Sequence, residues 1–166
     1  MQRWEAPEDG WIKGNADGAV AKQRNNGGGG VILRDHQGAF LAAAGFFFPH
    51  CTDPEGAEIR ACLELLRLAR NQNVQRILVE LDCQAAVQMI NSQERNLSAV
   101  GPWVQEIKGL LEEFLDFRVV WTRRSANEAA HKLARVSVGD ERSRVWVGVP
   151  PDFILDIVAN DIPNLF

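Results

Sequence analysis

The sequence predicts an α/β domain, in which helices cover a β-sheet. Three observations support this class: strand-like segments with short connections open the chain, the hydrophobic period becomes helical at Glu55, and helical and strand-like segments then alternate. At 166 residues the chain is long enough for one domain with a substantial core. We expect residues 1–10 to form a linker, 11–138 the domain, and 139–166 a tail that packs on it.

The first part of the domain is expected to be an antiparallel meander. Its first strand has Asn15 and Asp17 on one face by period two, and Ile12 and Ala16 on the other. The glycines of the following polar stretch favour a flexible turn, because glycine adopts positive φ without steric cost. The expected segments are a strand at 11–20, the turn at 22–30, a strand at 31–35, a hairpin turn at 36–38 and a strand at 39–48.

The second part alternates helices and strands. Apolar residues from Ile59 to Ala69 recur at helical spacing, which predicts a long amphipathic helix capped by Thr52 or Asp53. The spacing S-x-x-E at 125–128 is that of a capping box, so another helix is expected to begin there. The other expected segments are a buried strand at 76–81, a helix at about 84–90, a loop at 91–102, a helical stripe at 103–114, a strand at 117–122, a connector at 139–144 and a short apolar helix at 153–158.

Asp82 follows the buried strand directly and precedes a helical pattern. A carboxylate in this position lies at the C-terminal edge of a sheet, where open α/β folds have their ligand sites. We hypothesise that Asp82 meets Asp17 and Glu58 at this edge. The three carboxylates would then hold divalent metal for phosphodiester hydrolysis.

The composition constrains the setting of the domain. The net charge of −4 counts against a nucleic-acid-binding protein, which is usually basic. Cys51, Cys62 and Cys83 are scattered and lack CxxC spacing, which favours free thiols in a reducing compartment over a zinc site. No apolar stretch reaches membrane-spanning length, and no secretory leader is recognisable. We therefore expect an intracellular protein, cytoplasmic or nuclear, that does not associate with a membrane.

Five segments carry a resemblance to a known family. In order, they are GWIKGNADGAV at 10–20, GGGGVILRDHQGAFLAAA at 27–44, GAEIRACLELLRLA at 56–69, ILVELDCQAAVQMI at 77–90 and RRSANEAAHKLAR at 123–135. Together they resemble the ribonuclease H type 1 family, and more closely its plant retroelement-derived domains. The tail pattern W-x-x-x-P-P-D-F-I is also similar to that plant group.

The resemblance implies a three-layer fold with a mixed five-stranded sheet of order 3-2-1-4-5. It also implies an endoribonuclease that cuts the RNA strand of RNA–DNA hybrids with two metal ions, Mg²⁺ or Mn²⁺. By motif, the catalytic set falls on Asp17, Glu58, Asp82 and His131, with the three carboxylates as metal ligands. His131 stands where the general enzyme has a fourth carboxylate. Asn127 is implied to be a substrate contact or to support the ligands.

Each candidate also has an ordinary structural explanation. An aspartate followed by glycine, as at Asp17, is typical of a hairpin turn, and Glu58 near a helix start favours the helix dipole. Asp82 could be the N-cap of the next helix, and Glu80 is a rival carboxylate on the same strand face. His131 could be an ordinary surface histidine.

Expected substrate contacts beyond Asn127 are Gly18, Arg123 and Arg124. The two arginines, with Lys132 and Arg135, would form a local basic patch, or else a solvated helix end. The glycine run would let backbone approach the RNA strand. Some relatives carry a basic helical protrusion, but residues 91–101 are too short and too weakly charged for one. We therefore expect weak hybrid binding that falls steeply with salt.

Two other functions compete with the nuclease. One is a non-catalytic module that kept the fold and binds nucleic acid or protein. The other is an exonuclease of the same fold, which typically has a D-x-E first strand. Asn15, Ala16 and Asp17 lack that pattern.

Overall fold

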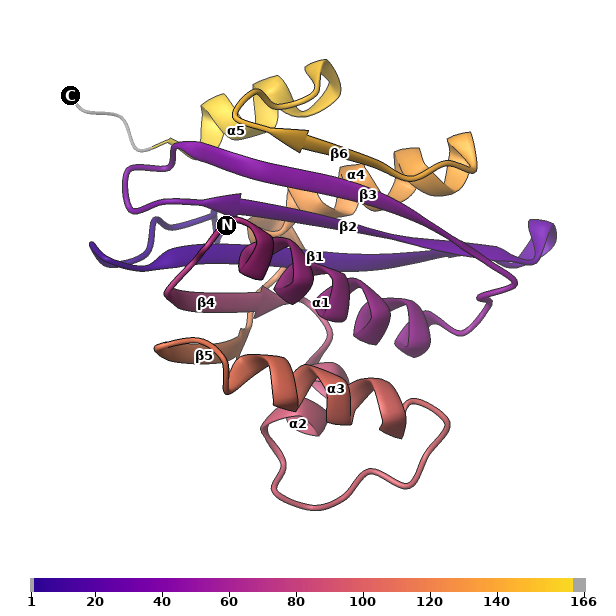
Figure 1. Cartoon of the computed structure of the whole chain (residues 1–166). Coiled ribbons are helices and arrows are strands. Elements are labelled where there is room, and N and C mark those ends of the chain that lie inside the picture. The colour runs from indigo at the N-terminus through magenta and orange to yellow at the C-terminus, as the bar shows by residue number, and fades with distance from the viewer. Residues whose placement is uncertain (1, 163–166) are drawn as a thin grey trace.

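The computed structural model describes residues 2–162, and its centre is a six-stranded mixed sheet (Figure 1). The strand order is β5-β4-β1-β2-β3-β6. The predicted order 3-2-1-4-5 is confirmed for the first five strands, and an additional edge strand beside β3 corrects the strand count. The strands are β1 (Ile12–Ala21), β2 (Asn26–Arg34), β3 (Phe40–Pro49), β4 (Arg76–Leu81), β5 (Asp116–Trp121) and β6 (Arg144–Val147). The helices are α1 (Pro54–Asn71), α2 (Gln84–Asn91), α3 (Gly101–Leu111), α4 (Glu128–Asp140) and α5 (Leu155–Asp161), with 3-10 turns η1 (Lys22–Arg24), η2 (Arg124–Ala126) and η3 (Asp152–Ile154).

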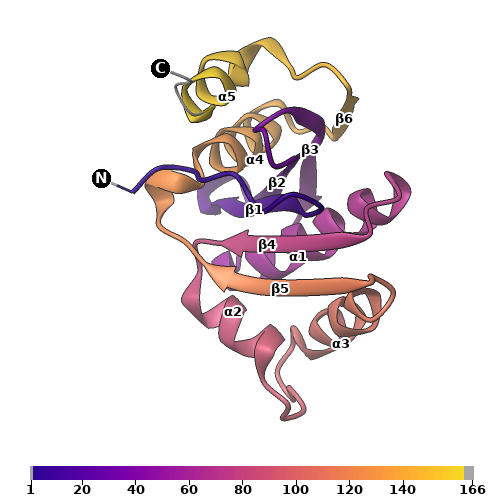
Figure 2. The same cartoon turned by 90° about the vertical axis from the view of Figure 1, so that its left-hand side faces the viewer.

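The helices cover both faces of the sheet (Figures 1 and 2). α1 lies against one face, where it joins α2, α3 and the central strands in the larger apolar core. α4 and α5 lie on the opposite face over a smaller core that includes Ile32, Leu133 and Ile154. The α/β fold class is thus confirmed as a three-layer arrangement.

The parallel pairing of β1 with β4 positions two of the candidate carboxylates. In this register Ala16 lies opposite Leu81. The next residues along the two strands are Asp17 and Asp82, which therefore reach the same edge of the sheet. β5 continues the parallel pairing on the far side of β4.

The predicted turn at 22–30 is wrong in its glycine half. Only residues 22–25 turn, and the glycines belong to β2, which begins at Asn26. A β-carbon on Gly30 would lie 2.2 Å from the carbonyl oxygen of Ala130 in α4. The run is therefore required for close packing of a helix on the sheet. Because Gly27 to Gly30 are buried, they offer no backbone surface to RNA.

Helix α1 begins as predicted. Asp53 is its N-cap, and one carboxylate oxygen accepts a hydrogen bond from the backbone N–H of Gly56 at 3.1 Å. Pro54 occupies the first turn, where a missing N–H costs nothing. The predicted capping box at the other long helix is wrong: α4 has Asn127 at its N-cap, and the Ser125 hydroxyl donates to the carbonyl of Gln2 instead.

The two terminal segments pack against the domain within the described residues. Trp4, in the segment expected as a linker, is 4% exposed and its indole N–H donates to Asn15. In the tail, Val145 and Trp146 belong to β6, and the Trp146 ring meets Phe153 edge-on with centroids 5.8 Å apart. The expected connector at 139–144 is shorter than predicted, because α4 runs to Asp140.

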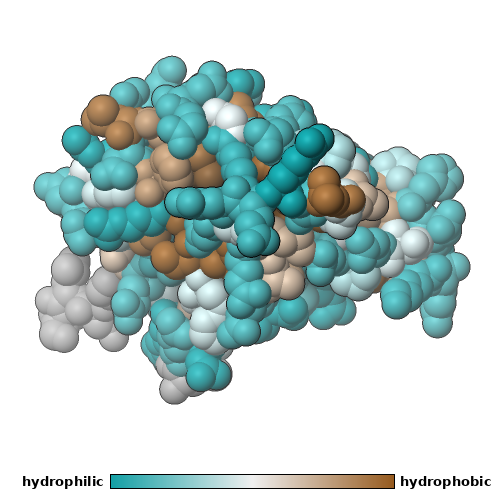
Figure 3. All heavy atoms as spheres, turned by 90° about the horizontal axis from the view of Figure 1, so that it is seen from below, coloured by the Kyte–Doolittle hydropathy of each residue, from teal (hydrophilic) through white to brown (hydrophobic). Residues whose placement is uncertain are grey.

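The outer surface is largely polar. On the side of α2 and α3, hydrophilic residues cover most of the face, with apolar residues in smaller areas between them (Figure 3). Among residues 2–162, no helix is both long enough and apolar enough to cross a membrane. The three cysteines are free thiols, as predicted.

Candidate metal centre

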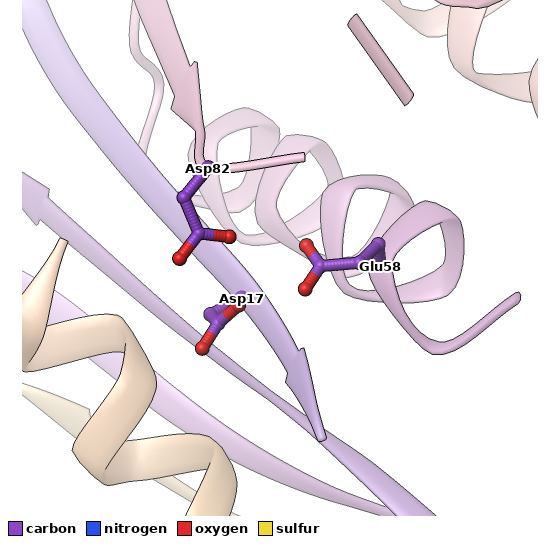
Figure 4. A group of neighbouring side chains, drawn as sticks. All are labelled: Asp17, Glu58 and Asp82. Carbon is purple, nitrogen blue, oxygen red and sulfur yellow. The ribbon is translucent and has the colours of Figure 1, made fainter. Parts of the chain in front are cut away.

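Three carboxylates from distant parts of the sequence converge at one edge of the sheet. Asp17 comes from β1, Glu58 from α1 and Asp82 from the residue after β4, and their side chains point toward one another (Figure 4). One oxygen of each lies within 4.8 Å of the others. The side chains of Asp17, Glu58 and Asp82 are 0%, 8% and 6% exposed. The structure thus brings together the three residues that were predicted as a metal-binding set.

A glycine allows α1 to approach β1 closely enough for this convergence. A β-carbon on Gly18 would lie 2.5 Å from the backbone nitrogen of Glu58 and from the carbonyl carbon of Ala57. The backbone N–H of Gly18 also faces the Glu58 carboxylate and lowers its pKa. Gly18 therefore has a clear role in positioning Glu58, in addition to its expected contact with substrate.

The cluster is electrostatically unfavourable without a cation. Burial and the neighbouring Asp17 raise the pKa of Glu58 to about 10, and the Gly18 N–H only partly opposes the shift. Burial and the charge of Asp17 also raise the pKa of Asp82, although Arg124 acts in the opposite direction. Among the described residues, Oδ1 of Asp17 and Oε2 of Glu58 are buried and have no hydrogen-bond partner.

This donor set fits a hard divalent cation. Carboxylate oxygens are the ligands that Mg²⁺ prefers, and Mn²⁺ accepts them as well. Buried oxygens without partners are rare, since each one costs desolvation energy that a bound cation would offset. Asp17, Glu58 and Asp82 could therefore hold such an ion, and the two unpaired oxygens give it direct ligands.

His131 and Arg124 form the outer rim of the cluster. Nδ1 of His131 lies 2.7 Å from Oδ2 of Asp17, and its Nε2 lies 3.3 Å from Nη1 of Arg124. A guanidinium can only donate, so Nε2 accepts and Nδ1 carries the proton that is donated to Asp17. Nε of Arg124 also donates to Oδ2 of Asp82 at 2.6 Å. These contacts link four side chains in a row, from Asp17 through His131 and Arg124 to Asp82.

Asn127 supports the site from within the core. Its side chain is fully buried, donates to the Ala16 carbonyl at 3.0 Å and accepts from the Asn15 amide at 3.0 Å. The amide of Asn15 also donates to Glu80 at 3.1 Å. Of the two roles expected for Asn127, the structure fits support of the ligands better than substrate contact, because the side chain has no exposed surface. It fixes the start of α4 to β1, beside Asp17.

The ordinary explanations fail for most candidates. Glu80 is not part of the cluster: it pairs with the buried Lys13 at 3.1 Å. Cys83, rather than Asp82, occupies the N-cap of α2, and it makes no side-chain cap bond. Glu55 is the acidic residue in the first turn of α1, so Glu58 is not needed there for the helix dipole. Asp17 lies within β1 and not in a turn.

The two neighbouring arginines differ in their contacts. Arg123 is exposed, and its guanidinium lies 5.8 Å from the centroid of the Trp121 ring. Arg124 is 59% exposed and contacts the cluster directly. Both arginines line a cavity of about 500 Å³ that also borders Asp82 and Trp121. The contact between Arg124 and Asp82 has no signal in the sequence, since it depends on the path of η2.

Comparisons with known proteins agree with this fold. A family model described as reverse transcriptase-like matches residues 15–137. An Arabidopsis thaliana protein that carries the provisional name ribonuclease H protein is 28% identical over 97% of this chain. The match covers 26% of that relative, so the chain spans about a quarter of its length.

Solved ribonuclease H structures share the arrangement. Ribonuclease H1 of Halobacterium salinarum has a TM-score of 0.71 and 23% identity, covering 80% of this chain and 99% of its own. The N-terminal ribonuclease H domain of a Mycobacterium tuberculosis protein has a TM-score of 0.72 and 18% identity, covering 78% and 94%. LC11 ribonuclease H1, solved with an RNA/DNA hybrid, has a TM-score of 0.69 and 18% identity, covering 78% and 98%. The chain therefore belongs to the reverse transcriptase-like family, and its fold is that of ribonuclease H.

Proposed function

We propose that this domain is a metal-dependent endoribonuclease that hydrolyses the RNA strand of RNA–DNA hybrids. The observation that carries the proposal is the convergence of Asp17, Glu58 and Asp82, with ligand oxygens within 4.8 Å of one another. Two of their buried oxygens lack a partner among the described residues, which is the state expected of ligands in the absence of their ion. The fold and the names of the relatives support a hydrolase of this type.

The three carboxylates of the cluster would hold the metal ions that carry out the hydrolysis. Two bound divalent ions would supply an activated water and stabilisation of the leaving 3′ oxygen. Asp17 contacts His131 and lies close to the other two carboxylates, so it would be one of the residues that hold the ions. Glu58 and Asp82 would supply the other protein ligands, and Asp82 borders the cavity through which substrate could approach.

His131 is suited to move a proton at the rim of the site. Its side chain is 29% exposed, so solvent and substrate can reach it. Nδ1 donates its proton to Asp17 in a hydrogen bond, which fixes the orientation of the ring. Nε2 accepts from Arg124, and it becomes available as an acceptor when Arg124 moves away. With Nδ1 engaged by Asp17, Nε2 is the nitrogen that could accept a proton from the attacking water.

Substrate binding would depend on a small basic area. Arg123 is exposed beside the cluster, and Lys132 and Arg135 project from the exposed side of α4. Against a net charge of −4, this area would give weak hybrid binding with a steep salt dependence. The RNA strand would be distinguished by its 2′-hydroxyl groups. The structure of LC11 ribonuclease H1 with an RNA/DNA hybrid supports this substrate class.

Cleavage assays with a single inactive control test the proposal. The domain is incubated with an RNA–DNA hybrid, an RNA duplex and a DNA duplex, each in Mg²⁺ and in Mn²⁺. We expect cleavage of the hybrid alone, and none by Asp82→Asn, whose circular dichroism should match that of the wild type. A folded wild-type domain that cuts the hybrid in neither metal would exclude the nuclease.

A non-catalytic nucleic-acid-binding or protein-interaction module is the alternative. The observations that favour it are His131 in place of a fourth carboxylate and the guanidinium of Arg124 on Asp82. Hybrid binding that is unaffected by Mn²⁺ and by Asp82→Asn, together with no cleavage, would identify such a module.

A further inference from the structure

The carboxylate cluster has two sides, one whose oxygens have no hydrogen-bond partner and one, here called the closed side, whose oxygens bond to other side chains. Oδ1 of Asp17 and Oε2 of Glu58 have no hydrogen-bond partner within residues 2–162. In contrast, Oδ2 of Asp17 bonds to His131, and Oδ2 of Asp82 bonds to Arg124. His131 and Arg124 thus occupy the closed side of the cluster, whereas the buried oxygens of the other side have no protein partner.

Arg124 supplies a positive charge on this closed side. Its Nε lies 2.6 Å from Oδ2 of Asp82 and its Nη1 lies 3.3 Å from His131. A guanidinium is not deprotonated in proteins, so Arg124 partly neutralises the carboxylates when no metal is bound.

We propose that Arg124 is an internal counter-ion that competes with divalent metal for Asp82 and so sets the metal affinity of the substrate-free domain. This inference rests on the proposed function, since it assumes that the cluster holds metal. A second cation beside Asp82 must displace the guanidinium or tolerate its charge, and both reduce affinity. Because Arg124 is 59% exposed, it can leave Asp82 without unpacking the core.

When Arg124 leaves Asp82, its guanidinium can bind a phosphate group of the substrate instead. A guanidinium binds phosphate oxygens as readily as carboxylate oxygens, through the same planar fork of donors. A phosphodiester group that approaches the cluster would attract Arg124 away from Asp82. Metal would then fill the closed side only when substrate is present, which would keep the substrate-free site from being saturated with cations.

The chain offers a matched control for this charge. Arg123 precedes Arg124 directly, and it contacts the Trp121 ring and makes no ion pair with a described carboxylate. Arg123→Gln and Arg124→Gln change the net charge equally and at adjacent positions. Any difference between the two variants therefore reports the contact with Asp82 rather than the overall field.

The experiment measures Mn²⁺ binding to the substrate-free domain by the loss of the free-ion electron paramagnetic resonance signal. The wild type, Arg124→Gln, Arg123→Gln and Asp17→Asn are titrated at fixed ionic strength. We expect Arg124→Gln to bind Mn²⁺ about five- to tenfold more tightly than the wild type, because a largely exposed ion pair no longer has to be broken. Arg123→Gln should match the affinity of the wild type within about twofold, because an exposed charge with no ion pair is largely screened by salt. Asp17→Asn should not bind Mn²⁺.

The outcomes separate this inference from the proposed function. Equal affinities of Arg124→Gln and Arg123→Gln, or weaker binding by Arg124→Gln, would overturn the inference while metal binding itself stands. If neither the wild type nor Arg124→Gln binds Mn²⁺, the proposed metal-dependent function fails as well. Arg124→Lys serves as the second variant, because lysine keeps the charge without the planar fork. It should have an affinity between those of the wild type and Arg124→Gln.

Discussion

The imidazole of His131 donates its Nδ1 proton to Oδ2 of Asp17 across 2.7 Å, on a carboxylate that is fully buried. This bond joins α4 to β1 at the carboxylate cluster. A neutral histidine holds the carboxylate in place but adds no negative charge for a second ion. The cluster therefore has three carboxylates, with a donor where the general enzyme of the resembled family has a fourth ligand.

The metal preference should respond to the residue at position 131. Imidazole suits Mn²⁺ better than Mg²⁺, whereas a carboxylate suits Mg²⁺. We expect His131→Asp to raise the ratio of Mg²⁺-dependent to Mn²⁺-dependent hybrid cleavage about tenfold, since one added carboxylate strengthens binding of the harder ion most. Initial rates in each metal, measured on the same hybrid, give this ratio.

His131→Asn is the control for this change. It keeps a polar side chain of similar reach but adds no charge, so the Mg²⁺ to Mn²⁺ ratio should stay at or below that of the wild type. If His131→Asn and His131→Asp shift the ratio equally, loss of the imidazole explains the effect and the charge argument is wrong.

Glu58 should make the metal-free domain less stable as pH rises. Its pKa is raised from 4.5 to about 10, first by burial and then by Asp17. The folded state therefore keeps a proton that the unfolded chain releases above pH 4.5, so the stabilisation is complete below that pH and is lost progressively up to about pH 10. We expect the free energy of unfolding to fall by up to about 1 kcal/mol per pH unit in this window.

Urea unfolding at pH 5 to 9 in a chelator checks the slope. Glu58→Gln has no proton to lose, so its stability should vary less with pH and exceed that of the wild type at the alkaline end. Adding Mn²⁺ should stabilise the wild type and leave Glu58→Gln nearly unchanged. Parallel pH profiles for the two proteins would refute the assignment to Glu58.

Substitution of Asn127 should affect the stability of the domain more directly than its activity. Its amide is fully buried and joins the Ala16 carbonyl to the side chain of Asn15. Asn127→Ala would remove both of these bonds from the core, although the Asn15 amide keeps its bond to Glu80, and we expect a cost of about 2–3 kcal/mol. Chemical denaturation measures the loss. Ser125→Ala, at the wrongly predicted cap, should cost under about 0.5 kcal/mol, because its hydroxyl bonds at the surface.

The sequence predicts much of this site because strand period fixes which side chains share a face. Asn15 and Asp17 were expected on one face, and both lie on the α4 side, where they meet Asn127 and His131. The buried run before Asp82 likewise predicts a strand whose end reaches the sheet edge. The convergence with Glu58 came from the family resemblance, since no local pattern links a helix position to two strands.

Other features depend on tertiary packing and leave a misleading local signal. A run of four glycines favours a turn by propensity, but here it lies in β2 because α4 packs directly on the backbone. The S-x-x-E spacing favours a capping box, but the chain enters a 3-10 turn and starts α4 at Asn127 instead. The pair of Arg124 and Asp82 spans elements that no short-range pattern connects.

The glycine run should therefore be intolerant of side chains for a packing reason. A β-carbon on Gly30 would lie 2.2 Å from the Ala130 carbonyl oxygen, so Gly30→Ala must push α4 away from β2. We expect a loss of about 3 kcal/mol or more, together with weaker Mn²⁺ binding, because α4 also carries His131. Gly139→Ala is the control in the same helix: its β-carbon would meet nothing within 4 Å, so helix propensity should make it neutral or stabilising by about 0.5–1 kcal/mol. Equal unfolding midpoints in urea for the two variants would show that α4 does not depend on the glycine run.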